Sequence, residues 1–444
     1  MSLRRKHLLF NNLVALAFAV SSMAAEPWTL ERSIRHALTN SPDARIAEKR
    51  IRAARAGIEQ ANAALWPQVQ LQSSYTRTDN PMRVFGAILN QRAYSPALDF
   101  NDVPDVDHLN VRGVVTQPLY TGGRIAFGRK AARASRDAAQ ATALAVQNLL
   151  AFEVARNFHN VVRTHKFIRA ADAGVRAFES NLIIASNRVT AGTALKTEWL
   201  DFEVRLAQAR EDLARARHAH ALARHALGNL LGLDPGQNGS FTVAESDSTP
   251  AAPESSDEAN RPELLALQHQ KRAAEARVGQ ARAGYRPRIS AFASMDYDYG
   301  WRTEGDGRNY TAGLMVEWDL WDGKRTHGRV AEAEADLDIV REEERKLLLA
   351  IRLEAEQAQL QFIEATERMA VTDAAVGHAA ESVRLTRSRF EQGLAIATQL
   401  IDAETALITA RVRRAEAEAD RRIAIAAWRR ALGLPQLPAD SQSR

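Results

Sequence analysis

The stretch Gln117-Pro118-Leu119-Tyr120-Thr121-Gly122-Gly123-Arg124 lies where a predicted β-strand ends and a long helix begins. A stretch of the same kind returns 201 residues later as Trp318-Asp319-Leu320-Trp321-Asp322-Gly323-Lys324-Arg325. At the same offset, Leu231-Gly232-Leu233 returns as Leu432-Gly433-Leu434. A repeated order of motifs at a fixed spacing indicates an internal duplication. Each copy predicts a β-hairpin that leads into a long helical stretch.

The duplication extends upstream at a different offset. Ser41-Pro42-Asp43 is matched by Arg261-Pro262-Glu263, and Trp66-Pro67 by Arg286-Pro287, and these two pairs share one larger offset. The 19-residue difference between the two offsets must lie between Pro67 and Gly122. The first hairpin is therefore expected to have the longer loop, roughly 79–108, which is rich in Pro, Asp and Asn.

Four segments alternate between apolar and polar residues, and we expect strands at about 67–78, 109–119, 287–299 and 309–320. The second loop, 302–308, contains Gly305-Asp306-Gly307 and predicts a tight turn. A period of two over about ten residues is typical of barrel strands that face lipid, although half-buried strands of soluble sheets also alternate. Aromatic residues near the strand ends suit a membrane interface: Tyr297, Tyr299, Trp301, Trp318 and Trp321.

The long helical stretches are expected at about 124–232 and 325–433, and neither contains an internal proline. Apolar residues recur in the first at spacings of 3, 4 or 7, which indicates coiled-coil packing: Leu150, Val154, Phe158, Val161, Ile168, Val175, Phe178 and Leu182. Ala191-Gly192-Thr193 and Gln392-Gly393-Leu394 predict a break in each stretch. At 1.5 Å per residue, a helix from 129 to 191 would span roughly 95 Å.

The remaining segments complete the expected organisation. Residues 1–25 have a basic start, a short apolar run and small residues at the end, which predicts a signal peptide. The first structural repeat is then 26–233 and the second 262–434. Residues 234–261 are rich in Pro, Gly, Ser and acidic residues and predict a linker, in which Phe241-Thr242-Val243 could form a short strand. Residues 435–444 form a C-terminal tail.

Composition excludes several classes of protein. The net charge of +5 falls to +2 without Arg4, Arg5 and Lys6 of the predicted signal peptide, so no basic surface for nucleic acid is expected. The chain has no cysteine, which excludes disulfides and thiolate metal sites. His218 and His225 lie about 10 Å apart along a helix, too far for one metal ion. We expect no metal, no cofactor and no enzymatic activity.

Four strands are too few to close a barrel in a membrane. Spanning barrels begin near eight strands, because an open edge leaves unpaired backbone groups in hydrocarbon. If the hairpins span a membrane, several copies must donate strands to one barrel. The polar strand faces would then line water, and the helices would continue that lumen on one side.

Several motifs resemble the TolC-like outer membrane efflux proteins. They are Trp28-Thr29-Leu30, Ala37-Leu38, Asn40-Ser41-Pro42, the hairpin exit 118–124, the helix breaks 191–193 and 392–394, and the two Leu-Gly-Leu ends. The resemblance covers essentially the whole chain after the predicted signal peptide. It implies a mostly α protein with a transmembrane β-barrel: a homotrimer with a 12-stranded barrel in outer membrane lipid and an α-helical tunnel in the periplasm of a Gram-negative bacterium. A periplasmic adaptor and an inner-membrane pump would be its partners.

The resemblance also implies roles for residues near the two breaks. Two acidic residues one helical turn apart normally narrow the periplasmic entrance and attract cations, and here those positions hold Gln399 and Asp402. Thr197 and Glu198 match the first-repeat side of a latch that closes the family's entrance. Its second-repeat side is altered, because Phe390 and Ala395 replace the aromatic hydroxyl and the Arg. The tips that dock an adaptor would be Gly192-Thr193 and Gly393-Leu394.

Two alternatives to small-molecule efflux remain at this point. The same kind of channel could be the exit duct for type I protein secretion, because cargo is chosen by the pump. A periplasmic coiled-coil scaffold or adaptor without a pore would explain the signal peptide and the long helices, but not the four alternating strands.

Overall fold

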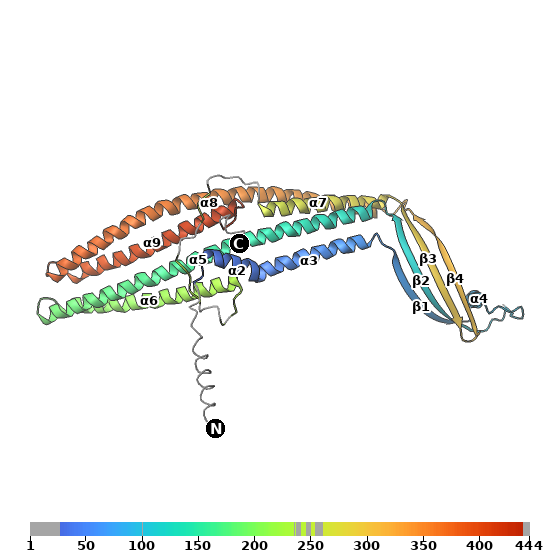
Figure 1. Ribbon diagram of the computed structural model, residues 1–444, viewed down its shortest axis with the longest axis horizontal. Coiled ribbons are helices and arrows are strands. Elements are labelled where there is room, and N and C mark those ends of the chain that lie inside the picture. Colours follow the sequence, from blue (N-terminus) through green and yellow to red (C-terminus); the bar gives the residue numbers. More distant parts are fainter. Residues whose placement is uncertain are drawn as a thin grey trace, which may run out of the picture. The chain divides into compact units, whose positions relative to one another are not determined.

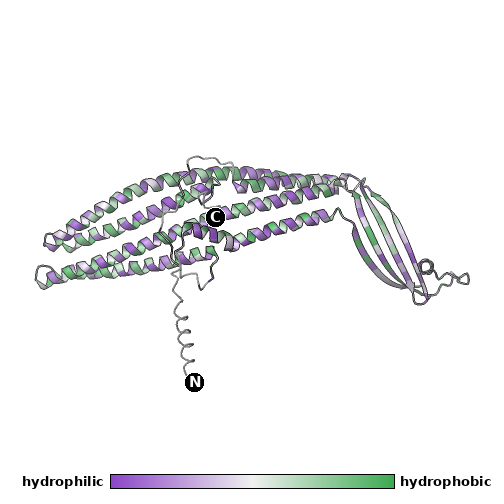
Figure 2. Cartoon of the chain, viewed as in Figure 1, coloured by the Kyte–Doolittle hydropathy of each residue, from purple (hydrophilic) through white to green (hydrophobic). Residues whose placement is uncertain are grey.

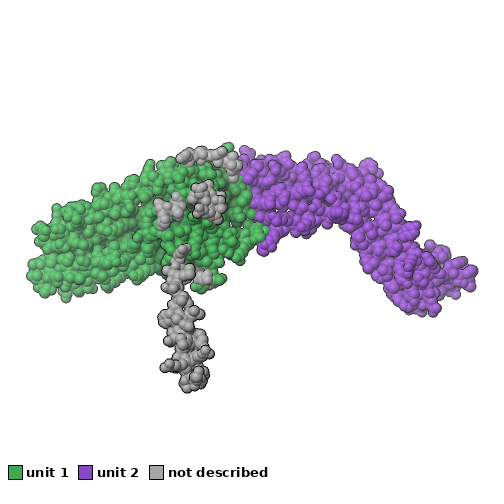
Figure 3. Space-filling view, viewed as in Figure 1, with its two compact units in different colours: residues 1–48, 143–262, 349–444 green, residues 49–142, 263–348 purple. Residues whose placement is uncertain are grey.

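The computed structural model describes residues 27–99, 101–234, 236, 241–245, 250–253 and 261–437. The predicted signal peptide and parts of the predicted linker and tail lie outside the described residues. The chain divides into two compact units (Figure 3): unit 1 comprises residues 1–48, 143–262 and 349–444, and unit 2 comprises 49–142 and 263–348. None of the described helices is both long enough and apolar enough to cross a membrane.

Unit 2 contains one antiparallel sheet in the order β1-β2-β3-β4 (Figure 1). Its strands are β1 (Gln68–Thr78), β2 (Val106–Tyr120), β3 (Arg288–Gly300) and β4 (Gly305–Glu317). The two hairpins meet where β2 pairs with β3, with Asn110 opposite Asp298 and Arg112 opposite Asp296. Strands from the two halves of the duplication therefore form one continuous sheet.

The second hairpin is shifted from the expected position. Its turn occupies residues 301–304, and Gly300 pairs with Gly305, so Gly305-Asp306-Gly307 lies in β4 rather than in the turn. β4 also ends at Glu317, not at 320, because Glu317 pairs with Arg288 and β3 has no earlier residue left to pair. Trp318 leaves the sheet, and its indole Nε1 donates to the carbonyl oxygen of Tyr285 at 3.1 Å.

The first hairpin loop contains a helix that the sequence analysis did not predict, α4 (Pro81–Asn90). The Asn80 side chain accepts a hydrogen bond from the Arg83 backbone N–H at 3.3 Å, and Pro81 occupies the first turn. Asn as the N-cap followed by Pro is a recognised start of a helix. Val84 and Ile88 lie one turn apart and are both buried, so this local signal was present in the sequence.

Three further helices precede the hairpins: α2 (Leu30–Asn40), α3 (Pro42–Ala63) and α7 (Pro262–Arg282), which the 3-10 turn η1 (Ala283–Tyr285) follows. The sequence analysis made no prediction for these segments. In unit 2, Ala274 and Val278 of α7 pack against Leu337. These contacts join α7, which precedes the second hairpin, to the long helix that follows that hairpin.

The long helices are α5 (Arg124–Thr190), α6 (Lys196–Leu231), α8 (Arg325–Glu391) and α9 (Ala397–Ala431). α5 and α8 have 67 residues each. α8 begins and ends 201 residues after α5 does, and α9 begins 201 residues after α6. This is the offset that relates the repeated motifs. The duplicated hairpin-plus-long-helix architecture is thus confirmed.

The core of unit 1 lies where α2, α5 and α6 meet, and its buried residues include Leu30, Ile34, Phe158 and Leu231. The expected linker strand adds to it as an isolated parallel bridge between Trp28 and Val243. The Trp28 N–H donates to the Thr242 carbonyl at 2.8 Å. This bridge places Phe241 in the same cluster and so ties the linker to the helices.

Candidate functional site: the helix tips and the polar strand face

The two helical hairpins of unit 1 end in matching turns. Gly192 and Gly393 adopt left-handed conformations with φ of 72° and 79°, which glycine accepts without steric cost. In each turn the next N–H bonds back to the helix, from Thr193 to the Arg188 carbonyl at 2.9 Å and from Leu394 to the Arg389 carbonyl at 2.8 Å. These bonds satisfy carbonyl groups that the helix end leaves unpaired. The four predicted docking residues therefore lie at two structurally equivalent tips.

The tips expose apolar side chains to solvent. Leu394 is 74% exposed, and Ile396 in the same turn and Leu195 in the turn before α6 are also exposed. These residues precede the first turns of α6 and α9, where the predicted entrance residues follow. An apolar end on an otherwise charged helical hairpin suits contact with another protein.

The structure places the predicted entrance residues in two groups. Gln399 and Asp402 lie three residues apart on α9, and both side chains are exposed. Thr197 is exposed on the first turn of α6, and Glu198 beside it is half-buried. The spacing of three puts Gln399 and Asp402 on one face of the helix, one turn apart.

Phe390 is not at the surface. Its side chain is fully buried and packs edge-to-face against Phe202, with ring centroids 5.6 Å apart. Ala395 is buried in the same cluster. The two residues that replace the family's second-repeat latch positions are therefore core residues that hold the α5–α6 and α8–α9 hairpins together.

A residue that the sequence analysis missed links the two tips. The Arg188 guanidinium lies over the Phe390 ring at 4.5 Å from its centroid. Its Nη1 donates to the Phe390 carbonyl at 3.0 Å, and its Nη2 to the Thr193 carbonyl at 3.3 Å. A cation near the carbonyl groups at a helix C-terminus is favourable. The sequence signal for this role was the position of Arg188 in the last turn of α5.

A buried carboxylate makes a second link, one that no local pattern predicts. Glu404 on α9 is 3% exposed and forms an ion pair with Arg387 of α8. It also accepts a hydrogen bond from the Asn181 side chain of α5 at 3.3 Å. Three helices are thus joined around one charge, which needs these partners to be tolerated in the protein interior.

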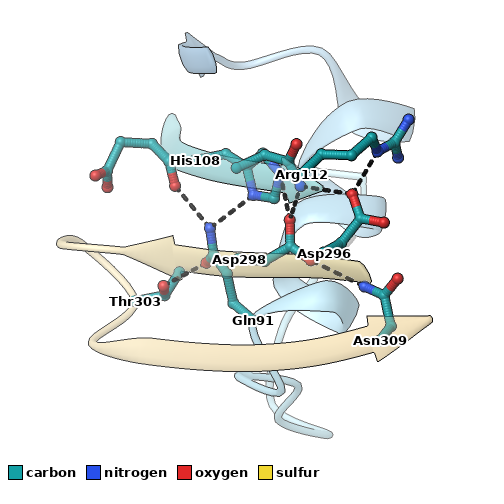
Figure 4. A network of polar contacts seen from close by, with 9 residues as sticks. Gln91, His108, Arg112, Asp296, Asp298, Thr303 and Asn309 are labelled. Carbon is teal, nitrogen blue, oxygen red and sulfur yellow. Dashed lines mark hydrogen bonds and ion pairs between the residues drawn. The ribbon is translucent and has the colours of Figure 1, made fainter. Parts of the chain in front are cut away.

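In unit 2, the register of the sheet puts the polar side chains on one face (Figure 4). The Asn110 side chain donates to Asp298 at 2.8 Å and to Asp296 at 3.1 Å, and Asn309 donates to Asp298 at 3.0 Å. Arg112 forms an ion pair with Asp296, and His108 lies 3.1 Å from Asp298. The two aspartates are buried among these donors, which is how buried carboxylates are stabilised.

The opposite face of the sheet is apolar and uncovered. Figure 2 shows polar and apolar residues interspersed along the strands, as the alternation predicts. Leu71 is 79% exposed and Tyr310 is 81% exposed, and both lie on this face. An antiparallel sheet with one polar and one exposed apolar face suits an environment that is not water on the apolar side.

Comparisons with known proteins agree with this geometry. The family model for "Outer membrane efflux protein" matches residues 33–233 and 255–434. The fold and the family match together define an outer membrane protein of the efflux class. The chain belongs to the outer membrane efflux protein family, and its predicted location in the outer membrane is confirmed.

Individual relatives are distant. The chain is 26% identical over 274 residues to the outer membrane protein OprJ of Pseudomonas aeruginosa, covering 57% of this chain and 55% of OprJ. It is 25% identical over 261 residues to the cation efflux system protein CusC of Escherichia coli, covering 58% of this chain and 53% of CusC. The chain thus spans about half the length of the curated relatives it matches.

Solved structures match over more of the chain. The outer membrane protein VceC of Vibrio cholerae superposes with a TM-score of 0.78 at 19% identity, covering 91% of this chain and 96% of VceC. The outer-membrane channel OprN gives a TM-score of 0.78 at 21% identity, covering 92% and 91%. At these identities the likeness shows the fold, and the TolC-like fold predicted from the sequence is confirmed.

Proposed function

We propose that the protein is the outer membrane channel of a tripartite efflux system. Three copies each contribute four strands to a 12-stranded barrel, and their long helices form a tunnel in the periplasm. The channel is a passive exit duct for small toxic solutes, which an inner-membrane pump delivers through a periplasmic adaptor. The names of relatives that act in cation and toluene efflux support this class of cargo.

The observation that carries the proposal is the open sheet. β1 and β4 are its edge strands, and among the described residues each pairs on one side only. Unpaired strand edges cannot remain in hydrocarbon, because their N–H and C=O groups would lose the hydrogen bonds that water supplies. The apolar face supports the membrane location, so β4 of one copy must pair with β1 of the next.

A second observation supports assembly through the helices. In unit 1, α8 carries a stripe of six large apolar residues. Successive members are 3, 4, 7, 8 or 14 residues apart, so they fall on one side of the helix. All six are exposed in the single chain: Leu349, Leu353, Leu360, Ile363, Val371 and Leu385. A neighbouring copy of the helical layer would cover this stripe.

The proposed entrance uses the exposed face of α9. In a trimer, Asp402 and Gln399 would form two rings at the periplasmic end, of which only the Asp402 ring is charged. Glu198 and Thr197 on α6 flank this entrance in our proposal. Phe390 is buried, so it acts by fixing the hairpins and not by lining the opening.

Planar-bilayer recording tests both the pore and the entrance. Purified protein should conduct ions, and multivalent cations added from the periplasmic side should partly block it. Asp402→Ala should relieve the block, because the ring then loses its negative charge, whereas Asp201→Ala, at an exposed position on α6, should not. A coiled-coil scaffold would give no conductance, and equal block in all three proteins would remove Asp402 from the entrance.

We also propose that the two tips dock the adaptor. Gly192, Thr193, Gly393 and Leu394 are small or apolar and leave room for another helical hairpin to approach closely. Gly192→Trp together with Gly393→Trp should abolish cross-linking to the adaptor in cells while leaving conductance intact. If cross-linking and efflux both survive, the adaptor binds elsewhere.

A further inference from the structure

The longer loop of the first hairpin folds back onto the sheet, on its polar face. Val106 and His108 lie two residues apart in β2 and so share that face. Val106 is buried in a cluster with Val84 and Ile88 of α4. The fully buried Gln91 donates from Nε2 to the Asp107 carbonyl at 2.8 Å and lies 3.2 Å from the His108 ring nitrogen. Figure 4 shows Gln91 among the polar residues of this face.

The part of the sheet beneath this loop consists of glycines and so has no side chains. We call these glycines (Gly300, Gly305 and Gly307) the seat of the loop. Gly307 pairs with Asp298, and Gly300 with Gly305, so all three glycines lie on the polar face. A Cβ at Gly307 would overlap the carbonyl oxygen of Asn90, and one at Gly305 would lie 2.6 Å from the Gln91 carbonyl oxygen. The loop backbone therefore rests directly on the backbone of the second hairpin, which only glycine permits.

The end of α4 is shaped to bring the chain onto this seat. Arg92 adopts a left-handed conformation with φ of 56°, although it is not glycine. The Arg92 N–H bonds to the Leu89 carbonyl at 3.0 Å and the Ala93 N–H to the Ile88 carbonyl at 2.9 Å, which is the Schellman arrangement. The Arg92 guanidinium also donates to the Arg308 carbonyl in β4 at 3.3 Å. A side chain in this backbone conformation is strained unless its surroundings hold it there.

We propose that residues 81–93 form an exit lid, which lies across the polar face at the loop end of the strands and narrows the opening of the pore. The inference rests on the proposed function, because the polar face is the lumen only if the copies close a barrel. The extra residues in the loop of the first hairpin would thus serve to form this lid. The lid also presents apolar groups away from the sheet, because Met82 and Leu89 are exposed.

The contacts of the lid allow it to lift. Its apolar cluster consists of Val84, Ala87, Ile88 and Val106, with only partly buried neighbours. Its buried polar anchor is Gln91, whose Oε1 accepts from the Thr303 hydroxyl in the turn of the second hairpin. A segment held by few apolar contacts, one buried amide and the exposed Arg92 guanidinium opens more readily than the strands beneath it.

Gly307→Ala tests the seat with a change of one methyl group. The added Cβ should displace the lid and raise single-channel conductance in planar bilayers. Gly113→Ala is the matched control, because it adds the same group to a strand glycine whose nearest neighbouring atom is 4.0 Å away. Both variants should remain heat-modifiable oligomers in the outer membrane. Equal conductance of Gly307→Ala, Gly113→Ala and wild type would overturn the lid.

A cross-link tests the opposite change in the cysteine-free chain. Gln91→Cys with Thr303→Cys, joined by a short bis-methanethiosulfonate reagent, should hold the lid down. In the double variant, passage of a larger solute through proteoliposomes should fall on cross-linking and return with dithiothreitol. The reagent should not change passage through either single variant. Failure of the pair to cross-link in intact outer membranes, or unchanged passage after cross-linking, would contradict the lid. If wild type itself does not conduct, the channel proposal fails first, and the lid with it.

Discussion

Helices α5 and α8 have the same length and the same place in their repeats, yet they have different surroundings. In unit 1, α5 packs many of its large apolar residues against its own chain, with Leu150, Val154 and Phe158 in the core, although Leu149 and Ile183 are exposed. The corresponding part of α8 exposes six large apolar residues, of which Leu360 is 66% and Val371 69% exposed. The duplication kept the length and the ends of the helix, but only α5 packs most of its apolar side against its own chain. In our account, α8 finds its partners in a neighbouring subunit.

The largest expected effect comes from charging the exposed stripe of α8. Leu353→Asp with Leu360→Asp would bury two unpaired carboxylates in each subunit interface, at a cost of several kcal/mol. Because about 1.4 kcal/mol corresponds to a tenfold change in an equilibrium constant, the fraction of trimer should fall by at least about tenfold. Light scattering coupled to size-exclusion chromatography in detergent would measure it.

The matched control for the stripe adds the same charges outside it. Gln357→Asp with Gln361→Asp places two carboxylates at exposed positions of α8 that lie off the stripe. This variant should stay trimeric. If both double variants assemble equally well, α8 is not covered by a second copy, and the difference between α5 and α8 needs another explanation.

A smaller effect is expected at the link between α8 and the rest of its own chain. Glu404→Ala would leave Arg387 and Asn181 without their shared buried acceptor, and breaking such a pair costs about 3 kcal/mol. The helical melting temperature, followed by circular dichroism, should fall clearly. Glu381→Ala breaks an exposed ion pair with Arg384 on the same helix and should leave the melting temperature unchanged. A similar result for both would contradict the burial of Glu404.

The smallest effect concerns the buried side of α5 and depends on pH. His159 is 3% exposed, and within the described part of the chain neither ring nitrogen has a hydrogen-bond partner. Burial, together with the nearby positive charge of Arg422, lowers the pKa of His159 to about 3. The charged groups around it are Arg163, Lys166, Glu418 and Arg422.

The direction in which stability changes with pH depends on the pH at which His159 is protonated in the folded and in the unfolded protein. The unfolded chain binds a proton at His159 near pH 6.5, whereas the folded protein does not until about pH 3. Stability is therefore lost as pH falls below 6.5, by about 1.4 kcal/mol per pH unit, or about 2 kcal/mol at pH 5. His159→Leu should lose less melting temperature between pH 7 and pH 5 than wild type does. His225→Leu, at an exposed position of α6, should behave like wild type, and an equal loss in all three proteins would be the contrary result.

The parts of the molecule that were predictable are those that local chemistry determines. The constant offset between the repeated motifs anticipated α5 and α8, because turn glycines and the absence of proline are local signals. Gly192 and Gly393 marked the tips for the same reason. The alternation of the strands showed which residues share a face without any knowledge of their partners.

The parts that were missed depend on contacts between distant segments. Gly305 and Gly307 suggested a turn, and their role became clear only when α4 was found resting on them. Phe390 was expected at the entrance because of its position in the family pattern, yet packing against Phe202 makes it a core residue. The position of Arg188 in the last turn of α5 was visible in the sequence, but its contact with Phe390 of the α8–α9 hairpin was not.

The central claim is that three copies close their open sheets into one barrel, and the mass of the particle tests it most directly. Native mass spectrometry of protein released from detergent micelles should give three times the mass of the single chain, to which heating should convert it. A particle of one or two copies, or a protein that stays in solution without detergent, would contradict the account.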